Sequence, residues 1–180
     1  IFGGSYNSAL TINSVVVSGT LNKANANFSF IGAGNNNETN ATYAFVGAGS
    51  GNKANALNSF VGAGSGNTTS GLRSAILNGS GNTTSGIDSV IIGGFGNSVT
   101  GNQSAIIGGS LITGTSNSTV YVPNLEVRTN MVVSGTTDLT GTVAAKGALN
   151  VSGATSLAST VIVGDTLSAN GGIRFETSGG

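Results

Sequence analysis

The sequence contains no cysteine, histidine or tryptophan and only one proline. The absence of cysteine excludes a disulfide framework and thiolate metal sites, and without histidine the commonest metal ligand and general base is missing. Charge is also scarce, because 6 Lys and Arg balance 6 Asp and Glu, with no basic cluster that would bind nucleic acid. We therefore expect no cofactor, no metal site and no nucleic-acid partner.

Long apolar runs are missing as well. No run approaches the roughly 18 residues of a membrane-spanning helix, so we expect no membrane insertion. The chain begins without Met and without a basic segment before an apolar one, and we interpret it as part of a longer protein. Glycine is abundant, at 31 of 180 residues, and hydrophobic residues make up 38%. This apolar content without net charge predicts a folded chain rather than a disordered one.

A fifteen-residue repeat fills most of the chain before residue 119. Similar segments, from SVVVSG to SAIIGG, begin at residues 14, 29, 44, 59, 74, 89 and 104 without a single insertion. The same phase makes Ile1 the third residue of an earlier, truncated repeat. The repeat predicts an all-β fold of stacked coils, a β-roll or β-helix, in which residues fifteen apart become neighbours.

Three positions of the repeat carry the structural signal. The third position is β-branched in every copy, as a strand residue entering a core should be, and predicts the core residues Val16, Ile31, Val46, Val61, Ile76, Ile91 and Ile106. The sixth position predicts a turn with positive φ, and its glycines are Gly4, Gly19, Gly34, Gly49, Gly64, Gly79, Gly94 and Gly109. The ninth position predicts a ladder of stacked amides, formed by Asn7, Asn22, Asn37, Asn52, Asn67, Asn82 and Asn97.

The second and fourth positions point to the side of the strand opposite the third. Their sizes compensate: Phe30, Phe45 and Phe60 are each followed by glycine two residues later, whereas Ala75 is followed by Leu77. We interpret this compensation as the mark of a packed interface. Fifteen residues provide two short strands and two turns per coil, which enclose little core. We therefore predict that three copies pack around one axis as a homotrimer.

The pattern changes after residue 118. The only proline follows in TVYVPNLEV, and we predict repeats over 1–118 and a connector over 119–129. Over 130–180 an eighteen-residue period aligns NMVVSGTTDLTGTVAAKG with ALNVSGATSLASTVIVGD. Short alternating strands of this kind close no core within one chain. We expect an intertwined β-shaft that continues beyond Gly180.

Both segments resemble known families. The unit repeated as NSFVGAGSGNTTSG resembles the head repeats of trimeric autotransporter adhesins, whose fold is a trimer of left-handed β-rolls, over about residues 1–118. That family's usual unit is close to fourteen residues. The units VSGTTDLTGTV and VSGATSLASTV look like the shafts of bacteriophage and large-virus tail fibres. Together the resemblances imply a viral fibre at the virion surface, with a bacterial surface adhesin as the alternative.

The sequence shows no residue arrangement typical of a catalytic site. Paired carboxylates would be needed to cleave a polysaccharide, and the acids are far apart at different repeat positions: Glu38, Asp88, Glu126, Asp138, Asp165 and Glu176. Without histidine, a serine nucleophile would need Lys23, Lys53 or Lys146 desolvated beside it. We predict that the chain is not an enzyme. Lys23, Glu38 and Lys53 share the tenth position, where an exposed inter-coil salt bridge of about 0 to 1 kcal/mol is expected.

The expected function is mechanical: a rigid trimeric rod that holds a receptor-binding tip away from a surface, with itself, other fibre proteins and a host receptor, which could be a glycan, as partners. Phe95 and Tyr121 are the only receptor-contact candidates, and core packing is the alternative for both. A different class is an ice-binding solenoid, since Thr68 stacks on Thr83 and Thr69 on Thr84. The charged tenth position argues against a regular ice face.

Overall fold

A computed structural model describes residues 1–128 and 132–134. The chain divides into two units, Ile1–Asn130 and Met131–Gly180. The eighteen-residue repeats predicted for 130–180 fall almost entirely in residues outside the described part. The fold is therefore that of the first unit.

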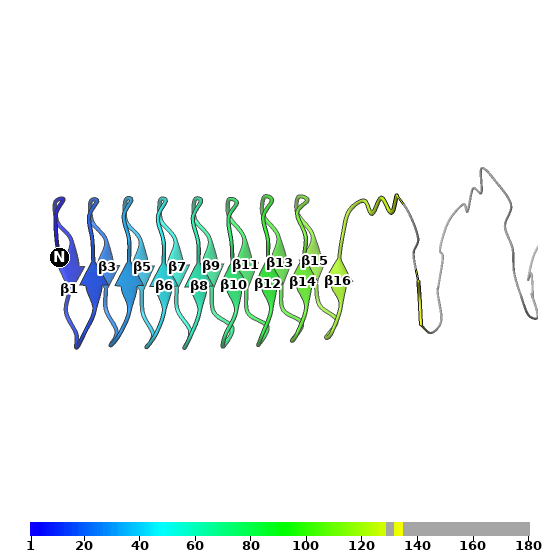
Figure 1. Ribbon diagram of the computed structural model, residues 1–180, viewed down its shortest axis with the longest axis horizontal. Helices are drawn as coiled ribbons and strands as arrows, with labels where there is room; N and C mark the ends of the chain where they lie inside the picture. The colour runs from blue at the N-terminus through cyan, green and yellow to red at the C-terminus, as the bar shows by residue number, and fades with distance from the viewer. Residues whose placement is uncertain (129–131, 135–180) are drawn as a thin grey trace, which may run out of the picture. The chain divides into compact units, whose positions relative to one another are not determined.

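The first unit is a β-solenoid of about eight fifteen-residue coils, and the described residues contain no helix (Figure 1). Each coil contributes one two-residue strand to each of two eight-stranded parallel sheets. The odd-strand sheet consists of β1 (Ser8–Ala9), β3 (Lys23–Ala24), β5 (Glu38–Thr39), β7 (Lys53–Ala54), β9 (Thr68–Thr69), β11 (Thr83–Thr84), β13 (Ser98–Val99) and β15 (Thr113–Gly114). The even-strand sheet consists of β2 (Val15–Val16), β4 (Phe30–Ile31), β6 (Phe45–Val46), β8 (Phe60–Val61), β10 (Ala75–Ile76), β12 (Val90–Ile91), β14 (Ala105–Ile106) and β16 (Val120–Tyr121).

The strand register follows directly from the repeat length. Lys23 pairs with Glu38 and Phe30 with Phe45, so partners are fifteen residues apart in both sheets. A third ladder of single bridges runs from Ser5 through Thr20 and further coils to Ser110. Each coil therefore has three sides, one more than the two strands and two turns predicted from the sequence. A single bridge per coil, at a position of mixed composition, leaves no strand pattern to detect.

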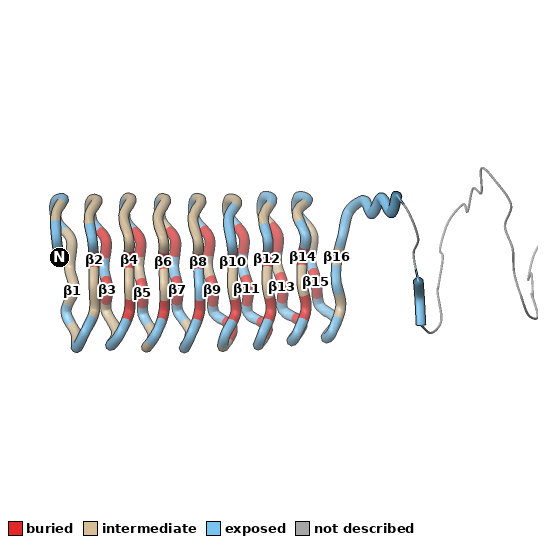
Figure 2. Tube along the Cα trace, viewed as in Figure 1, coloured by how far each residue is buried: buried red, intermediate tan, exposed pale blue. Residues whose placement is uncertain are grey.

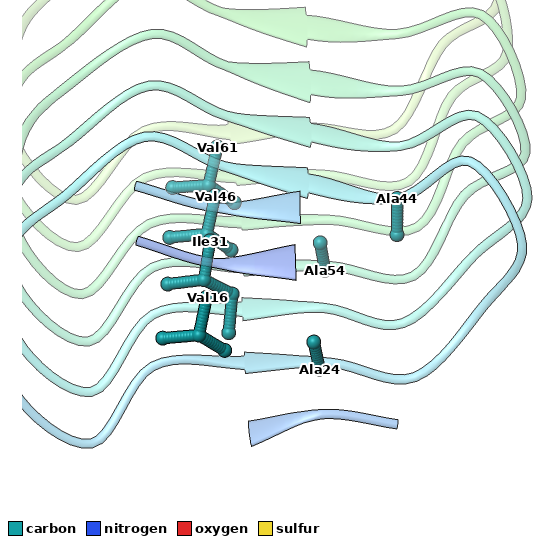
Figure 3. Close-up of a cluster of buried hydrophobic side chains, with 7 residues drawn as sticks. All are labelled: Val16, Ala24, Ile31, Ala44, Val46, Ala54 and Val61. Atoms are coloured by element: carbon teal, nitrogen blue, oxygen red, sulfur yellow. The ribbon is translucent and has the colours of Figure 1, made fainter. Parts of the chain in front are cut away.

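The core lies between the two sheets and is thin. Val16, Ile31, Val46 and Val61 stack on one another from the even strands, and smaller residues such as Ala24 face them from the odd strands (Figure 3). These side chains are fully buried, and buried stretches, drawn in red, recur in successive coils (Figure 2). In the earlier coils the Val or Ile of the even-strand sheet faces a smaller Ala or Thr of the odd-strand sheet, because a fifteen-residue coil encloses room for little more. Val99, which packs with Ile91 and Ile106, is the exception.

The corners depend on residues with positive φ. The sixth-position glycines have φ between +84° and +111°, and a Cβ on Gly34 would collide with the carbonyl oxygen of Gly49 and lie 2.7 Å from the amide nitrogen of Asn37. The eighth and fifteenth positions are also left-handed. The fifteenth position holds no glycine in any coil: its residues, with φ of +53° to +59°, are Asn13, Phe28, Tyr43, Asn58, Arg73, Asp88, Gln103 and Ser118.

The ninth-position asparagines satisfy buried backbone groups. Asn37 donates from Nδ2 to the carbonyl of Ala33 in its own coil at 3.0 Å and to that of Gly49 in the next at 2.9 Å. Its Oδ1 accepts from the backbone N–H of Asn52 at 3.0 Å. The amides from Asn22 to Asn97 are buried, whereas Asn7 in the first coil is half-buried. Each amide therefore connects neighbouring coils and closes the glycine corner beside it.

The stack of coils ends in three changes. Ile112 takes the ninth position and bonds Asn97 Oδ1 through its backbone N–H at 2.9 Å. Tyr121 replaces the β-branched core residue, and its ring packs against Gly114 while its hydroxyl accepts from Ser116 N–H at 2.9 Å. Pro123 stands at the fifth position and packs against Gly109 of the preceding coil. The N–H of this position donates to the next coil only from Ser18 to Ala63, so that ladder ends before the proline is reached.

Candidate interaction surface

The described part of the solenoid shows neither a pocket nor a metal cluster. In residues 1–128 and 132–134 no pocket is formed, and no three His, Cys, Asp or Glu side chains come together to hold a metal ion. No helix of the described part is long and apolar enough to cross a membrane. The features described below are those of the outer faces of the coils.

The outer face of the even-strand sheet is apolar along its length. Phe30, Phe45 and Phe60 form a stack with ring centroids 5.0 Å apart and interplanar angles of 9° and 7°. Beyond this stack the apolar bulk moves to the fourth position, where Leu77, Ile92 and Ile107 are each 44% exposed. We call this surface the apolar face; its larger residues are Val15, Val17, Phe30, Phe45, Phe60, Leu77, Val90, Ile92 and Ile107.

The size compensation on this face has a cause within the chain. A Cβ on Gly47 would lie 3.4 Å from the ring of Phe45 in the same coil, and it would collide with the carbonyl oxygen of Gly62 in the next. The phenylalanine ring thus covers its own coil's glycine. Contacts within one chain therefore also favour glycine beside each phenylalanine, so the compensation does not by itself require the interface predicted from the sequence. The exposure of the face itself is the feature that points to a partner.

The outer face of the odd-strand sheet is polar. Lys23, Glu38 and Lys53 align in register at the tenth position, but the ion pairs of the described residues do not include them. Glu38 accepts a hydrogen bond from Asn25 Nδ2 at 3.0 Å instead, so the predicted salt bridge does not form. The four threonines considered for an ice face do not share one surface. Thr69 and Thr84 are fully buried, and of the four only Thr68 and Thr83 point outward.

The acids of the described part do not form a catalytic pair. Asp88 receives two hydrogen bonds from Arg73, at 2.6 and 2.7 Å across neighbouring coils, and this guanidinium lowers the pKa of the Asp88 carboxyl. Glu126 pairs with Arg128 at 2.9 Å, and Glu38 lies in β5 of the odd-strand sheet. The remaining acids, Asp138, Asp165 and Glu176, lie outside the described residues. The lysine Lys146 also lies outside them, while Lys23 and Lys53 are exposed.

Aromatic side chains also lie on two other parts of the surface. Phe95, one of the two receptor candidates from the sequence, is 57% exposed in the third ladder, whereas Tyr121, the other, packs into the end of the core. Sequence reasoning missed the pair Phe28 and Tyr43, which stack with centroids 5.2 Å apart at 21° on the fifteenth-position corner. Their spacing of fifteen residues was a signal that could have identified them as neighbours.

Comparison with protein-family models gives no match, and comparison with curated proteins gives none either. The functional argument therefore depends on the surfaces of the solenoid.

Proposed function

We propose that this chain is a structural and adhesive component of a virus tail fibre: a rigid trimeric rod at the virion surface that presents a receptor-binding tip for host attachment. The observation that carries this proposal is the apolar face, which continues over successive coils of a solenoid without a pocket in its described residues. The proposal assigns no catalytic step to the chain. Its partners are two further copies, other fibre proteins and a receptor on the host.

Burial of the apolar face is the physical reason for three copies. Parallel sheets in proteins are normally covered on both sides, and contiguous exposed apolar patches on monomers rarely exceed a few hundred Å². Here Ile92 and Ile107 at the fourth position are nearly half exposed in a single chain. Three apolar faces turned toward one axis would remove all of them from water. The polar odd-strand faces would then form the outside of the rod.

The coil geometry suits a mechanical role. Within each sheet, every strand except the two at the ends pairs with a strand of the preceding coil and a strand of the following coil. Successive coils are about 4.8 Å apart, as neighbouring strands of a sheet are. Stiffness follows from the in-register ladders and the buried asparagines, which oppose bending between coils. A rod with threefold symmetry presents three identical binding faces together, and this multivalency raises the effective affinity for a surface.

The test is the native mass and shape of the protein, measured by light scattering and electron microscopy. We expect a threefold mass in a thin rod for the wild type, and a single-chain mass for Ile92→Lys, which places a charge in the apolar face. Thr83→Lys is the matched control, because its exposed side chain lies on the odd-strand face, and it should keep the threefold mass. A monomeric wild type would overturn the proposal.

A further inference from the structure

The corner that carries Phe28 and Tyr43 is strained. Both residues have positive φ, +56° and +59°, in a region that costs a residue with a Cβ roughly 1–2 kcal/mol. Glycine, asparagine and aspartate tolerate this conformation best. The neighbouring coils place Asn13 and Asn58 at the same corner. The fold therefore accepts asparagine here, and the backbone does not require an aromatic residue.

Packing does not account for the two rings. Phe28 is 45% exposed and Tyr43 is 55% exposed, and the two contact each other as a stacked pair at the edge of the solenoid. A stacked pair contributes only about 0.5–1.5 kcal/mol beyond its buried area. That gain is smaller than the roughly 2–4 kcal/mol of strain at two such corners, so the stacking alone does not account for the pair. The positive φ recurs at this position in all eight coils, so the strain belongs to the coil, and what distinguishes this corner is its pair of exposed rings.

The surroundings of the pair are polar and uncharged. Asn27, Thr42 and Asn58 come from the same corner of adjacent coils. The Oδ1 of Asn27 accepts from Ile12 N–H at 3.2 Å, while its Nδ2 group forms no hydrogen bond among residues 1–128 and 132–134. The charged corner residues farther along the stack, Arg73 and Asp88, neutralise each other as an ion pair. The site thus combines two apolar ring surfaces with amide and hydroxyl groups.

We propose that the Phe28–Tyr43 pair is a binding site for a neutral glycan. A sugar ring presents C–H groups on its faces and hydroxyls around its rim, so its face can pack on an exposed aromatic ring while amides such as Asn27 bond the hydroxyls. The absence of an unpaired charge at this described corner selects against sialylated or uronic-acid glycans. This inference rests on the proposed role in host attachment and adds a receptor class and a site within the solenoid.

A second copy of the chain fits this corner less well than a glycan does. A copy aligned in register would meet the whole fifteenth-position column, which is polar after Tyr43: Asn58, Arg73, Asp88, Gln103 and Ser118. The apolar face, by contrast, continues in coils on both sides of the Phe stack. An aromatic pair restricted to two coils suits a ligand of the size of a few sugar residues.

The test uses the double variant Phe28→Asn and Tyr43→Asn, which restores the residue found at this corner in the neighbouring coils. Binding is measured on an array that carries cellohexaose, maltohexaose and chitohexaose as neutral probes and sialyllactose as a charged one, followed by calorimetry. We expect the wild type to bind at least one neutral probe in preference to sialyllactose. The double variant should bind it at least tenfold more weakly, with an unfolding midpoint equal to or above that of the wild type.

Tyr6→Asn is the matched control, since it removes an exposed aromatic residue from another left-handed corner of the coil and should leave binding unchanged. The proposal is overturned if no neutral probe binds the wild type, if sialyllactose is preferred, or if the double variant binds as well as the wild type. A fall in the native mass of the double variant would instead make the corner an interface between copies. Because the native mass of the wild type is measured separately, a threefold mass without glycan binding removes this inference and leaves the fibre proposal intact.

Discussion

Replacing Asn67 by alanine removes one rung of the buried amide ladder. The Asn67 side chain donates to the carbonyls of Ala63 at 3.1 Å and Gly79 at 2.9 Å, and its Oδ1 accepts from the backbone N–H of Asn82 at 3.1 Å. The residue is fully buried, so water does not replace these bonds without entering the core. The substitution therefore leaves polar backbone groups without partners in neighbouring coils.

The expected loss of unfolding free energy depends on which of these backbone groups keep another hydrogen-bond partner. The carbonyl of Gly79 still accepts from Ser65 N–H at 3.0 Å, whereas the N–H of Asn82 and the carbonyl of Ala63 lose the bonds that Asn67 provided. Each orphaned buried group costs roughly 1–3 kcal/mol, and the lost amide atoms leave a small cavity. We expect Asn67→Ala to lower the free energy of unfolding by about 3–5 kcal/mol.

Urea denaturation of the wild type and Asn67→Ala measures this loss, with Asn78→Ala as the control. Asn78 is exposed, and its side chain accepts one hydrogen bond from the N–H of Gly79, so its removal should cost under about 1 kcal/mol. Since repeat proteins unfold with nearest-neighbour cooperativity, hydrogen exchange should show the lost protection concentrated near Asn82. A loss for Asn67→Ala no larger than for Asn78→Ala would refute the reasoning.

Three further outcomes are expected. Deletion of residues 59–73 should keep circular dichroism and native mass intact, because it removes one whole period, whereas deletion of 59–72 turns each following side chain to the wrong face and should abolish the cooperative melt. The buried hydroxyls of Ser29 and Thr39 have no hydrogen-bond partner in the described part. Ser29→Ala with Thr39→Val should therefore raise the unfolding free energy by about 1–2 kcal/mol, and an unchanged urea midpoint would contradict this. The lowered pKa of Asp88 stabilises the fold above the ordinary carboxyl value of 3.8, and that contribution is lost as pH falls through the lowered value. Asp88→Asn should remove this part of the pH dependence of the urea midpoint, which would stay as steep as in the wild type if the pair had no effect.

Much of the fold was predictable because one number, the period, fixes the register of every coil. A period of fifteen with no insertion means that Val16 must lie beside Ile31, and the strand pairing has that register. Side-chain alternation then assigns the third position to the core and its neighbours to the outside. Val16 and Ile31 are fully buried, while Phe30, which precedes Ile31 in the strand, is half-buried. These conclusions need only the repeat and the geometry of a strand.

The remaining features depend on contacts that no single repeat displays. The third ladder pairs Ser80 with Phe95, two residues that share no strand propensity, so its existence is set by the path of the coil. The left-handed corner at the fifteenth position was missed because glycine, the usual sign of positive φ, is absent there. The fit of Tyr121 against Gly114 joins two residues that are each atypical for their positions. A search for recurring residue types therefore does not find them.

The apolar face and the fifteenth-position corner differ in how constant their side chains are from coil to coil. On the apolar face every coil presents a large aliphatic or aromatic residue at the second or fourth position, which is the pattern of a surface covered along its length by a partner with the same period. At the fifteenth position the backbone is uniform, but the side chains vary among amide, aromatic, charged and hydroxyl groups. Because the coil keeps the same backbone with amide, aromatic, charged and hydroxyl side chains there, the residue type at this corner is not fixed by folding and can serve recognition. Substitutions at that corner should therefore alter binding while leaving native mass unchanged, whereas charges placed in the apolar face should alter both.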